Sequence, residues 1–164
     1  MRIAVVGGVA AGTSAAAKAR RENSNAEIVL FEKGKNISYA GCGLPYYISD
    51  LINDREKVVI NTPRDFSEKY NVEIKIRHEV IDINVDSKTI MYKNLKKKIM
   101  GEYSYDKLII ATGAVPIFPP IPGKDLDNVI TLRTVEDADN IKKIIKDNKI
   151  GHAVIVGLKN VLAC

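Results

Sequence analysis

Residues 3–12 read Ile3-Ala4-Val5-Val6-Gly7-Gly8-Val9-Ala10-Ala11-Gly12, and this stretch decides the fold. Four consecutive apolar residues are typical of a parallel strand that is covered on both faces. The alanine-rich residues 10–23 predict a helix with cations near its end, and residues 27–31 predict a second apolar strand. We therefore expect an α/β fold that begins with a strand–helix–strand unit and has glycines at its first turn.

The order of these residues is that of a Rossmann nucleotide-binding fingerprint. Gly7 permits a tight turn, Gly12 lets the helix pack closely, and the helix N-terminus offers free N–H groups to a pyrophosphate. Glu32 follows at the spacing of an acidic residue that binds a ribose, which argues against a 2′-phosphate. Val9 stands where the fingerprint has its middle glycine. A glycine-bearing turn without a ligand is the alternative interpretation.

The remaining pattern predicts further elements and a division into domains. Thr62-Pro63 predicts the capped start of a helix that runs to Tyr70, and Thr134 predicts the cap of a helix that runs to Asp147. The other expected elements are a small antiparallel meander over residues 72–103, a buried strand at 108–111 and another that begins at 153–156. We expect a first domain at 1–115, a proline-rich connector at 116–133 and an incomplete second domain at 134–164.

The composition bounds the class of protein. The chain has 164 residues, 46% of them hydrophobic and 27% charged, with a net charge of +5, as in a globular protein. Its one dense lysine run, residues 96–98, has no interleaved aromatic residue, so we expect a solvated turn or strand edge there and no nucleic-acid partner. No apolar stretch approaches the length of a membrane span or a secretory signal. The two cysteines, Cys42 and Cys164, fit a reducing, cytoplasmic setting, and no cluster has the spacing of metal ligands.

Cys42 is the candidate reactive residue. It lies in Ser38-Tyr39-Ala40-Gly41-Cys42-Gly43-Leu44-Pro45-Tyr46-Tyr47-Ile48, ahead of an expected short helix. A thiol at a helix N-terminus has its thiolate favoured by the dipole and is then a nucleophile. The alternative is an inert, buried cysteine.

Several segments together resemble one family. These are residues 5–12, 31–33, 38–48, 105–114 and 131–133. They are similar to the pyridine nucleotide-disulfide oxidoreductases, and within them to the single-cysteine branch of coenzyme A-disulfide reductases, NADH oxidases and persulfide reductases. The resemblance implies a Rossmann-like FAD-binding domain, with NAD(P)H as the electron donor in the full-length family.

The resemblance also implies roles for individual residues. Cys42 would be catalytic, attacking the disulfide of coenzyme A or a related disulfide or persulfide. Residues implied to bind the cofactor are Gly7, Gly8, Val9, Ala10, Gly12, Glu32, Lys33, Cys42, Val80, Ala111, Thr112, Gly113 and Arg133. Those implied to bind coenzyme A are Ser14, Lys18, Arg21 and Ser38. Lys18 and Arg21 suit its phosphates, although they equally suit the negative end of a helix.

The sequence departs from the family at three places. Ala10 replaces a histidine that is common in the oxidases and peroxidases, which favours disulfide or persulfide reduction. Gly41 replaces the asparagine usual before the cysteine of the reductases. After Gly157 the second glycine fingerprint does not follow, so we expect a truncated chain without its own NAD(P)H turnover, whereas full-length members are homodimers. An oxidase or peroxidase fragment using a cysteine sulfenic acid, and a non-catalytic FAD-binding or nucleotide-binding module, remain alternatives.

Overall fold

The computed structural model describes residues 1–148 and 150–156, and the chain divides into two compact units. The first unit consists of residues 1–39 and 59–113, and the second of residues 40–58 together with those from 114 on. The predicted domain boundaries stay predictions. The units differ from them in grouping the Cys42 segment with the later part of the chain.

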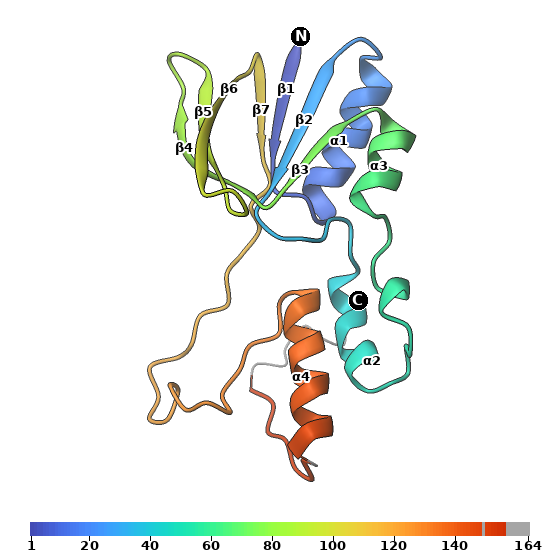
Figure 1. Cartoon of the computed structure of the whole chain (residues 1–164), viewed down its shortest axis with the longest axis vertical. Coiled ribbons are helices and arrows are strands. Elements are labelled where there is room, and N and C mark those ends of the chain that lie inside the picture. The colour runs from blue at the N-terminus through green and yellow to red at the C-terminus, as the bar shows by residue number, and fades with distance from the viewer. Residues whose placement is uncertain (149, 157–164) are drawn as a thin grey trace. The chain divides into compact units, whose positions relative to one another are not determined.

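The first unit is built on a four-stranded parallel sheet with the strand order β3-β2-β1-β7 (Figure 1). Its strands are β1 (Arg2–Val6), β2 (Glu27–Glu32), β3 (Glu73–Ile76) and β7 (Lys107–Ile110). Apolar residues 3–6 and 28–31 are buried, as expected for central strands covered on both faces. β7 lies at the edge of the sheet, and there Ile110 is 62% exposed.

The two faces of this sheet are covered by different layers. Helices α1 (Ala10–Glu22) and α3 (Pro63–Tyr70) cover one face, where Val5 and Leu30 pack with Ala16 and Phe66. The antiparallel strands β4 (His78–Asn84), β5 (Thr89–Asn94) and β6 (Ile99–Ser104) cover the other. Because neighbouring residues of a strand point to opposite faces, the apolar runs of the central strands pack against both layers. The α/β fold with a small antiparallel sheet is confirmed.

One boundary of the predicted meander is wrong. β3, predicted as part of an antiparallel meander over 72–103, instead pairs in parallel with β2, with Leu30 opposite Ile74. The alternation of apolar and charged residues in β3 reflects an edge strand that is only half covered, and an antiparallel strand shows the same alternation. The lysine run 96–98 lies in the exposed turn between β5 and β6, as expected.

The described residues of the second unit form two short 3₁₀ helices and two α-helices. They are η1 (Gly41–Gly43), α2 (Leu44–Ile48), η2 (Arg55–Lys57) and α4 (Val135–Asn148). α2 and α4 lie side by side (Figure 1).

The predicted caps are confirmed, because Thr62 and Thr134 each accept a hydrogen bond from the backbone N–H three residues later.

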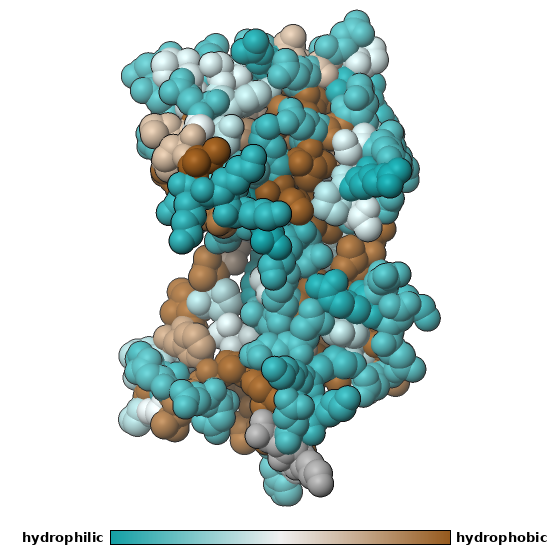
Figure 2. Space-filling model, viewed as in Figure 1, coloured by the Kyte–Doolittle hydropathy of each residue, from teal (hydrophilic) through white to brown (hydrophobic). Residues whose placement is uncertain are grey.

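The later residues of this unit are exposed. Apolar side chains reach the surface of the molecule in several places (Figure 2). Residues 114–133 form no helix or strand, and several of their apolar side chains are exposed; Ile117 is 89% exposed. The expected strand at 153–156 is not formed, and Val154 is 91% exposed. A buried strand needs a hydrogen-bonded neighbour, and no strand in the described part of the chain pairs with these residues.

Tyr103 of β6 supplies a test of how the antiparallel layer is held on the sheet. Its hydroxyl donates to Oε1 of Glu27 at 3.0 Å, and burial, followed by this bond, raises the pKa of Tyr103. An unfolded tyrosine loses its proton near pH 10, so the stabilisation by folded Tyr103 is complete below that pH and declines above it. We predict that Tyr103→Phe lowers the free energy of unfolding by about 1 kcal/mol at pH 8, and that the difference narrows above about pH 10.

Urea unfolding followed by circular dichroism between pH 7 and pH 11 measures this difference. A constant gap between the two proteins up to pH 11 would contradict the prediction.

Candidate functional site

The turn between β1 and α1 is too tight for a side chain at two of its glycines. A Cβ on Gly12 would lie 1.8 Å from the carbonyl oxygen of Gly7. A Cβ on Gly7, which has a φ of +102°, would lie 2.1 Å from the carbonyl oxygen of Ala111. The sequence therefore places the first turn of α1 directly against the carboxyl end of β1.

The turn after β7 meets the same place. Ala111 donates its N–H to the carbonyl of Val6 at 2.7 Å, and the backbone nitrogen of Thr112 lies 3.2 Å from the position of a Cβ on Gly7. Gly113 has a φ of +69°, a conformation that favours glycine. The predicted cofactor segments 7–12 and 111–113 thus lie together at the carboxyl edge of the parallel sheet, where α/β proteins bind ligands.

The N-terminus of α1 is open to an anion. Val9 is the N-cap residue, and among the described residues no side chain caps this helix end and no acidic residue occupies its first turn. Ala10 and Ala11 are exposed. The first N–H groups of a helix lack intrahelical partners and carry a partial positive charge, so this end suits a phosphate.

Glu32 is oriented by two backbone donors. The N–H of Gly8 donates to Oε2 at 2.7 Å and the N–H of Gly34 donates to Oε1 at 2.6 Å. Because each carboxylate oxygen accepts more than one hydrogen bond, the group can still accept a ribose hydroxyl. Lys33 is exposed next to it in the chain.

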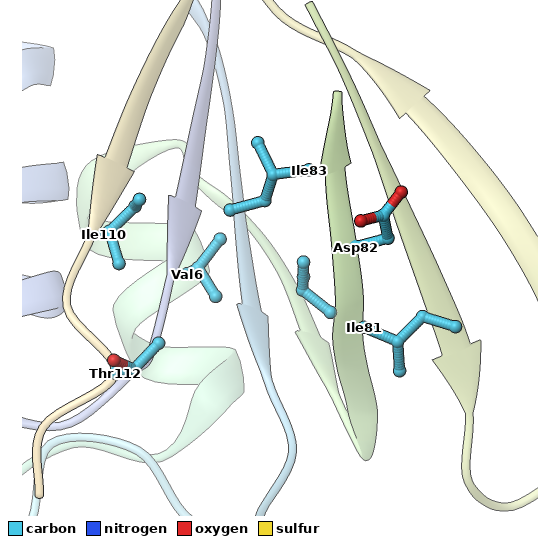
Figure 3. Close-up of a pocket in the computed structure, with 7 residues that line it drawn as sticks. Val6, Ile81, Asp82, Ile83, Ile110 and Thr112 are labelled. Carbon is cyan, nitrogen blue, oxygen red and sulfur yellow. The ribbon is translucent and has the colours of Figure 1, made fainter. Parts of the chain in front are cut away.

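A pocket of about 380 Å³ opens between the two sheets of the first unit. Val6, Ile110 and Thr112 line it from the carboxyl ends of β1 and β7 (Figure 3). Val80, Ile81, Asp82 and Ile83 of β4 line the opposite side. Most of the lining is apolar, so the pocket suits a flat, weakly polar group beside the glycine turn. Val80 and Thr112, both expected at the cofactor, are among its residues.

The residues implied for coenzyme A are divided between two environments. Ser14, Lys18 and Arg21 are exposed on α1 at spacings that place them on one helix face, and Lys18 forms an ion pair with Glu22. Ser38 is only 8% exposed, and its N–H donates to the carbonyl of Gly8 at 3.0 Å. The structure therefore brings Ser38 to the glycine turn, whereas Ser14, Lys18 and Arg21 lie further along α1.

Cys42 lies in the second unit, at the centre of η1, and is exposed with a free thiol. Cys42 is therefore not buried, and its reactivity stays a prediction. Arg133 is an exposed residue of the same unit, and its N–H donates to Asp137 at 2.9 Å.

Sequence reasoning missed several polar contacts. The Asn61 amide donates to the hydroxyl of Ser38 at 3.1 Å. In the second unit, Asp139 accepts hydrogen bonds from Tyr47 and Arg55. The helical spacing of residues 135, 138, 139 and 142 was the available signal for an α4 face that packs on another element.

No helix within residues 1–148 and 150–156 has the length and apolar character needed to cross a bilayer. In the same part of the chain, no group of three His, Cys, Asp or Glu side chains is placed to hold a metal ion.

The glycine turn, the open helix end and the oriented Glu32 define a dinucleotide-binding α/β domain. Comparison with known proteins makes the class specific: the family model of the pyridine nucleotide-disulphide oxidoreductases matches residues 1–157, and the chain belongs to this family. The family consists of FAD-dependent enzymes that use NAD(P)H.

Individual relatives are similar along nearly the whole chain. It is 40% identical over 156 residues to a coenzyme A disulfide reductase of Staphylococcus haemolyticus, covering 95% of this chain and 35% of that protein. It is also 40% identical over 158 residues to an NADH oxidase of Methanocaldococcus jannaschii, covering 96% and 35%. The structure of reduced Bacillus anthracis CoADR-RHD superimposes with a TM-score of 0.87 at 44% identity, covering 90% of this chain and 27% of that one. The chain thus spans about a third of the length of these curated relatives.

Gly12 gives a direct test of the close packing at the turn. Because an added Cβ would overlap backbone atoms of Gly7, we predict that Gly12→Ala lowers the free energy of unfolding by about 3 kcal/mol. Gly41→Ala is the matched control, since a Cβ there meets nothing within 4 Å among the described atoms, and it should change stability by less than about 1 kcal/mol. Equal effects of the two substitutions in urea unfolding would contradict the packing described for Gly12.

Proposed function

We propose that this chain is the FAD-binding portion of an NAD(P)H-linked reductase of coenzyme A disulfide or of related disulfides and persulfides, with Cys42 as its redox-active residue. The observation that carries the proposal is the glycine turn at which backbone donors, an open helix end and the Glu32 carboxylate lie together.

The residues at this turn fit FAD. Gly7, Gly8 and Gly12 let the chain pack closely around the turn where the pyrophosphate would bind, and the backbone at Val9 and Ala10 begins the open end of α1. Glu32 would accept a hydroxyl of the adenosine ribose, with Lys33 close by. Val80 and Thr112 line an apolar pocket of suitable character for the adenine. Ala111 and Gly113 complete the turn, and Arg133 is proposed as a further cofactor contact. When bound, a flavin supplies electron transfer between a nicotinamide and sulfur.

Cys42 would act as the nucleophile. Its thiolate would attack one sulfur of the substrate disulfide, forming a mixed disulfide with the enzyme and releasing the other half of the substrate as a thiolate. Two electrons and a proton would then restore the cysteine thiolate and release the second thiol. The exposure of Cys42 supports this role, because the substrate sulfur must reach it.

The coenzyme A contacts remain part of the proposal. Lys18 and Arg21 supply exposed positive charge for the phosphates, with Ser14 on the same face of α1. Ser38 would contact the ligand from its place beside Gly8. If the substrate is instead a small disulfide or persulfide without these phosphates, Ser14, Lys18 and Arg21 have no role in binding it.

Reduction of oxygen or peroxide through a cysteine sulfenic acid is the second candidate function. It is favoured by the relative named NADH oxidase, which is as similar to this chain as the relative named coenzyme A disulfide reductase. Ala10, in place of the histidine of many oxidases, favours disulfide reduction. A non-catalytic FAD-binding module is the remaining alternative.

The proposal includes the setting of the protein. We place it in the cytoplasm, where thiols stay reduced, and assign the full-length enzyme a homodimeric state.

FAD titration tests the cofactor assignment. We predict that the purified chain quenches FAD fluorescence with saturation, and that Glu32→Ala weakens this binding at least about tenfold, as loss of a hydrogen bond to a charged group implies. Glu73→Ala is the control, since Glu73 is an exposed acid on the neighbouring strand with an ion pair to Lys75.

A folded chain that takes up no FAD would overturn the assignment of the turn. If FAD binds but mass spectrometry finds no coenzyme A adduct on Cys42 after incubation with coenzyme A disulfide, the substrate assignment fails and the cofactor assignment stands.

A further inference from the structure

The segment that carries Cys42 is a closed loop. The N–H of Ala40 donates to the carbonyl of Val58 at 2.8 Å, which joins the two ends of residues 40–58. Leu44 and Val58 are buried inside it, at 1% and 0% exposure. Cys42 lies two residues after the closing contact at Ala40 and two residues before the start of α2, so its position depends on both.

Helix α4 presents one face to this loop. Val135 and Ala138 are fully buried, and Asp139 and Lys142 continue the same face at helical spacing. The start of α4 is fixed because Thr134 and Asp137 exchange hydrogen bonds, from Thr134 N–H to Oδ2 at 2.8 Å and from Asp137 N–H to Oγ1 at 3.2 Å.

Asp139 uses both carboxylate oxygens on the Cys42 loop. The hydroxyl of Tyr47 donates to Oδ1 at 3.0 Å, and Nε of Arg55 donates to Oδ2 at 2.9 Å. Burial, together with the bond to Asp139, raises the pKa of Tyr47, and the bond to Asp139 raises the pKa of Arg55. Tyr47 thus stays a neutral donor and Arg55 a cation at ordinary pH.

Both partners of Asp139 follow Cys42 in the chain, but their contacts lead back to Cys42 from its two sides. Tyr47 belongs to α2, which begins two residues after Cys42. The carbonyl of Arg55 accepts from the N–H of Val58 at 3.2 Å, and Val58 is the residue that closes the loop onto Ala40. One carboxylate is therefore connected to the chain before Cys42 and to the chain after it.

Lys142 adds a contact on one side only. Its ammonium donates to the carbonyl of Tyr47 at 2.8 Å and to the carboxylate of Asp50, and it lies 4.4 Å from the centre of the Tyr47 ring. These contacts close the C-terminal end of α2. They do not reach Arg55, so Asp139 is the residue that joins both sides.

On the basis of the role proposed for Cys42, we propose that Asp139 is its positioning residue: through Tyr47 and Arg55 it holds the 3₁₀ turn in which the thiol is presented to a disulfide. Asp139 does not touch the thiol or the substrate. Removal of Asp139 frees the turn to take up other conformations. A disulfide reaction needs the thiolate in line with the sulfur–sulfur bond, so this freedom slows it more than it slows the reaction with a small alkylating reagent.

The experiment uses the full chain with Cys164→Ser, so that Cys42 is its sole thiol. Mixed-disulfide formation with coenzyme A disulfide is followed by mass spectrometry, and alkylation by iodoacetamide is measured in parallel. We expect Asp139→Ala to slow the disulfide reaction about tenfold and to change alkylation by less than about twofold. Asp139→Asn, which keeps an acceptor for Tyr47, should restore part of the rate. Glu68→Ala is the control, because Glu68 is an exposed acid that pairs with Arg64 on α3.

Hydrogen exchange of the amides in residues 40–48 gives a readout that is independent of the chemistry. We expect the amides of residues 40–48 to exchange faster in Asp139→Ala, while the protection of the other amides and the circular dichroism spectrum are retained. Unchanged exchange overturns the proposal, and so does a wild-type rate with coenzyme A disulfide in a folded variant. If the wild-type chain itself forms no mixed disulfide, the proposed function fails, while the exchange data still decide whether Asp139 holds the turn.

Discussion

The contact between Gly12 and the carbonyl of Gly7 is the constraint on which the first unit depends. It lets α1 begin at the very end of β1, and so places the unpaired N–H groups of the helix at the carboxyl edge of the sheet. The same short turn brings the N–H of Gly8 within reach of Glu32 and allows the exit of β7 to approach Gly7. A larger residue at either glycine would separate these groups, so the geometry of the site follows from two missing side chains.

Much of the fold could be predicted from the sequence because its signals are local. Continuous apolar runs mark the central strands, and Thr62 and Thr134 mark helix starts whose hydrogen bonds span three residues. β3 could not be assigned in the same way. Its alternating pattern reports that one face is uncovered, and only its pairing with β2 distinguishes a parallel edge strand from an antiparallel one. The run at 153–156 is apolar like β1 but is exposed, because strand pattern without a pairing partner does not produce a strand.

The environment of Cys42 was less predictable for a related reason. The short segment around Cys42 indicated a reactive thiol, yet the groups that hold this segment come from α4. Asp139 lies 84 residues after Arg55 and 92 residues after Tyr47 in the chain. From a single sequence, a carboxylate on an amphipathic helix is expected to be a solvated surface charge. Both of its partners lie in a distant segment of the chain, so no local spacing could reveal that they share it.

The register of the parallel sheet explains why the apolar pocket lies beside the polar turn. Val6 and Ile110 are paired across β1 and β7, so their side chains point to the same face, toward the antiparallel layer (Figure 3). The next residue after Val6 is Gly7, where the strand ends and the turn that leads to the uncapped start of α1 begins. A ligand at this edge therefore meets backbone N–H groups and an acid at the turn and an apolar wall between the sheets. The ligand that we propose, an adenine dinucleotide, has a phosphate joined through a ribose to a flat base, and the proposed fit depends on strand register as much as on the glycine motif.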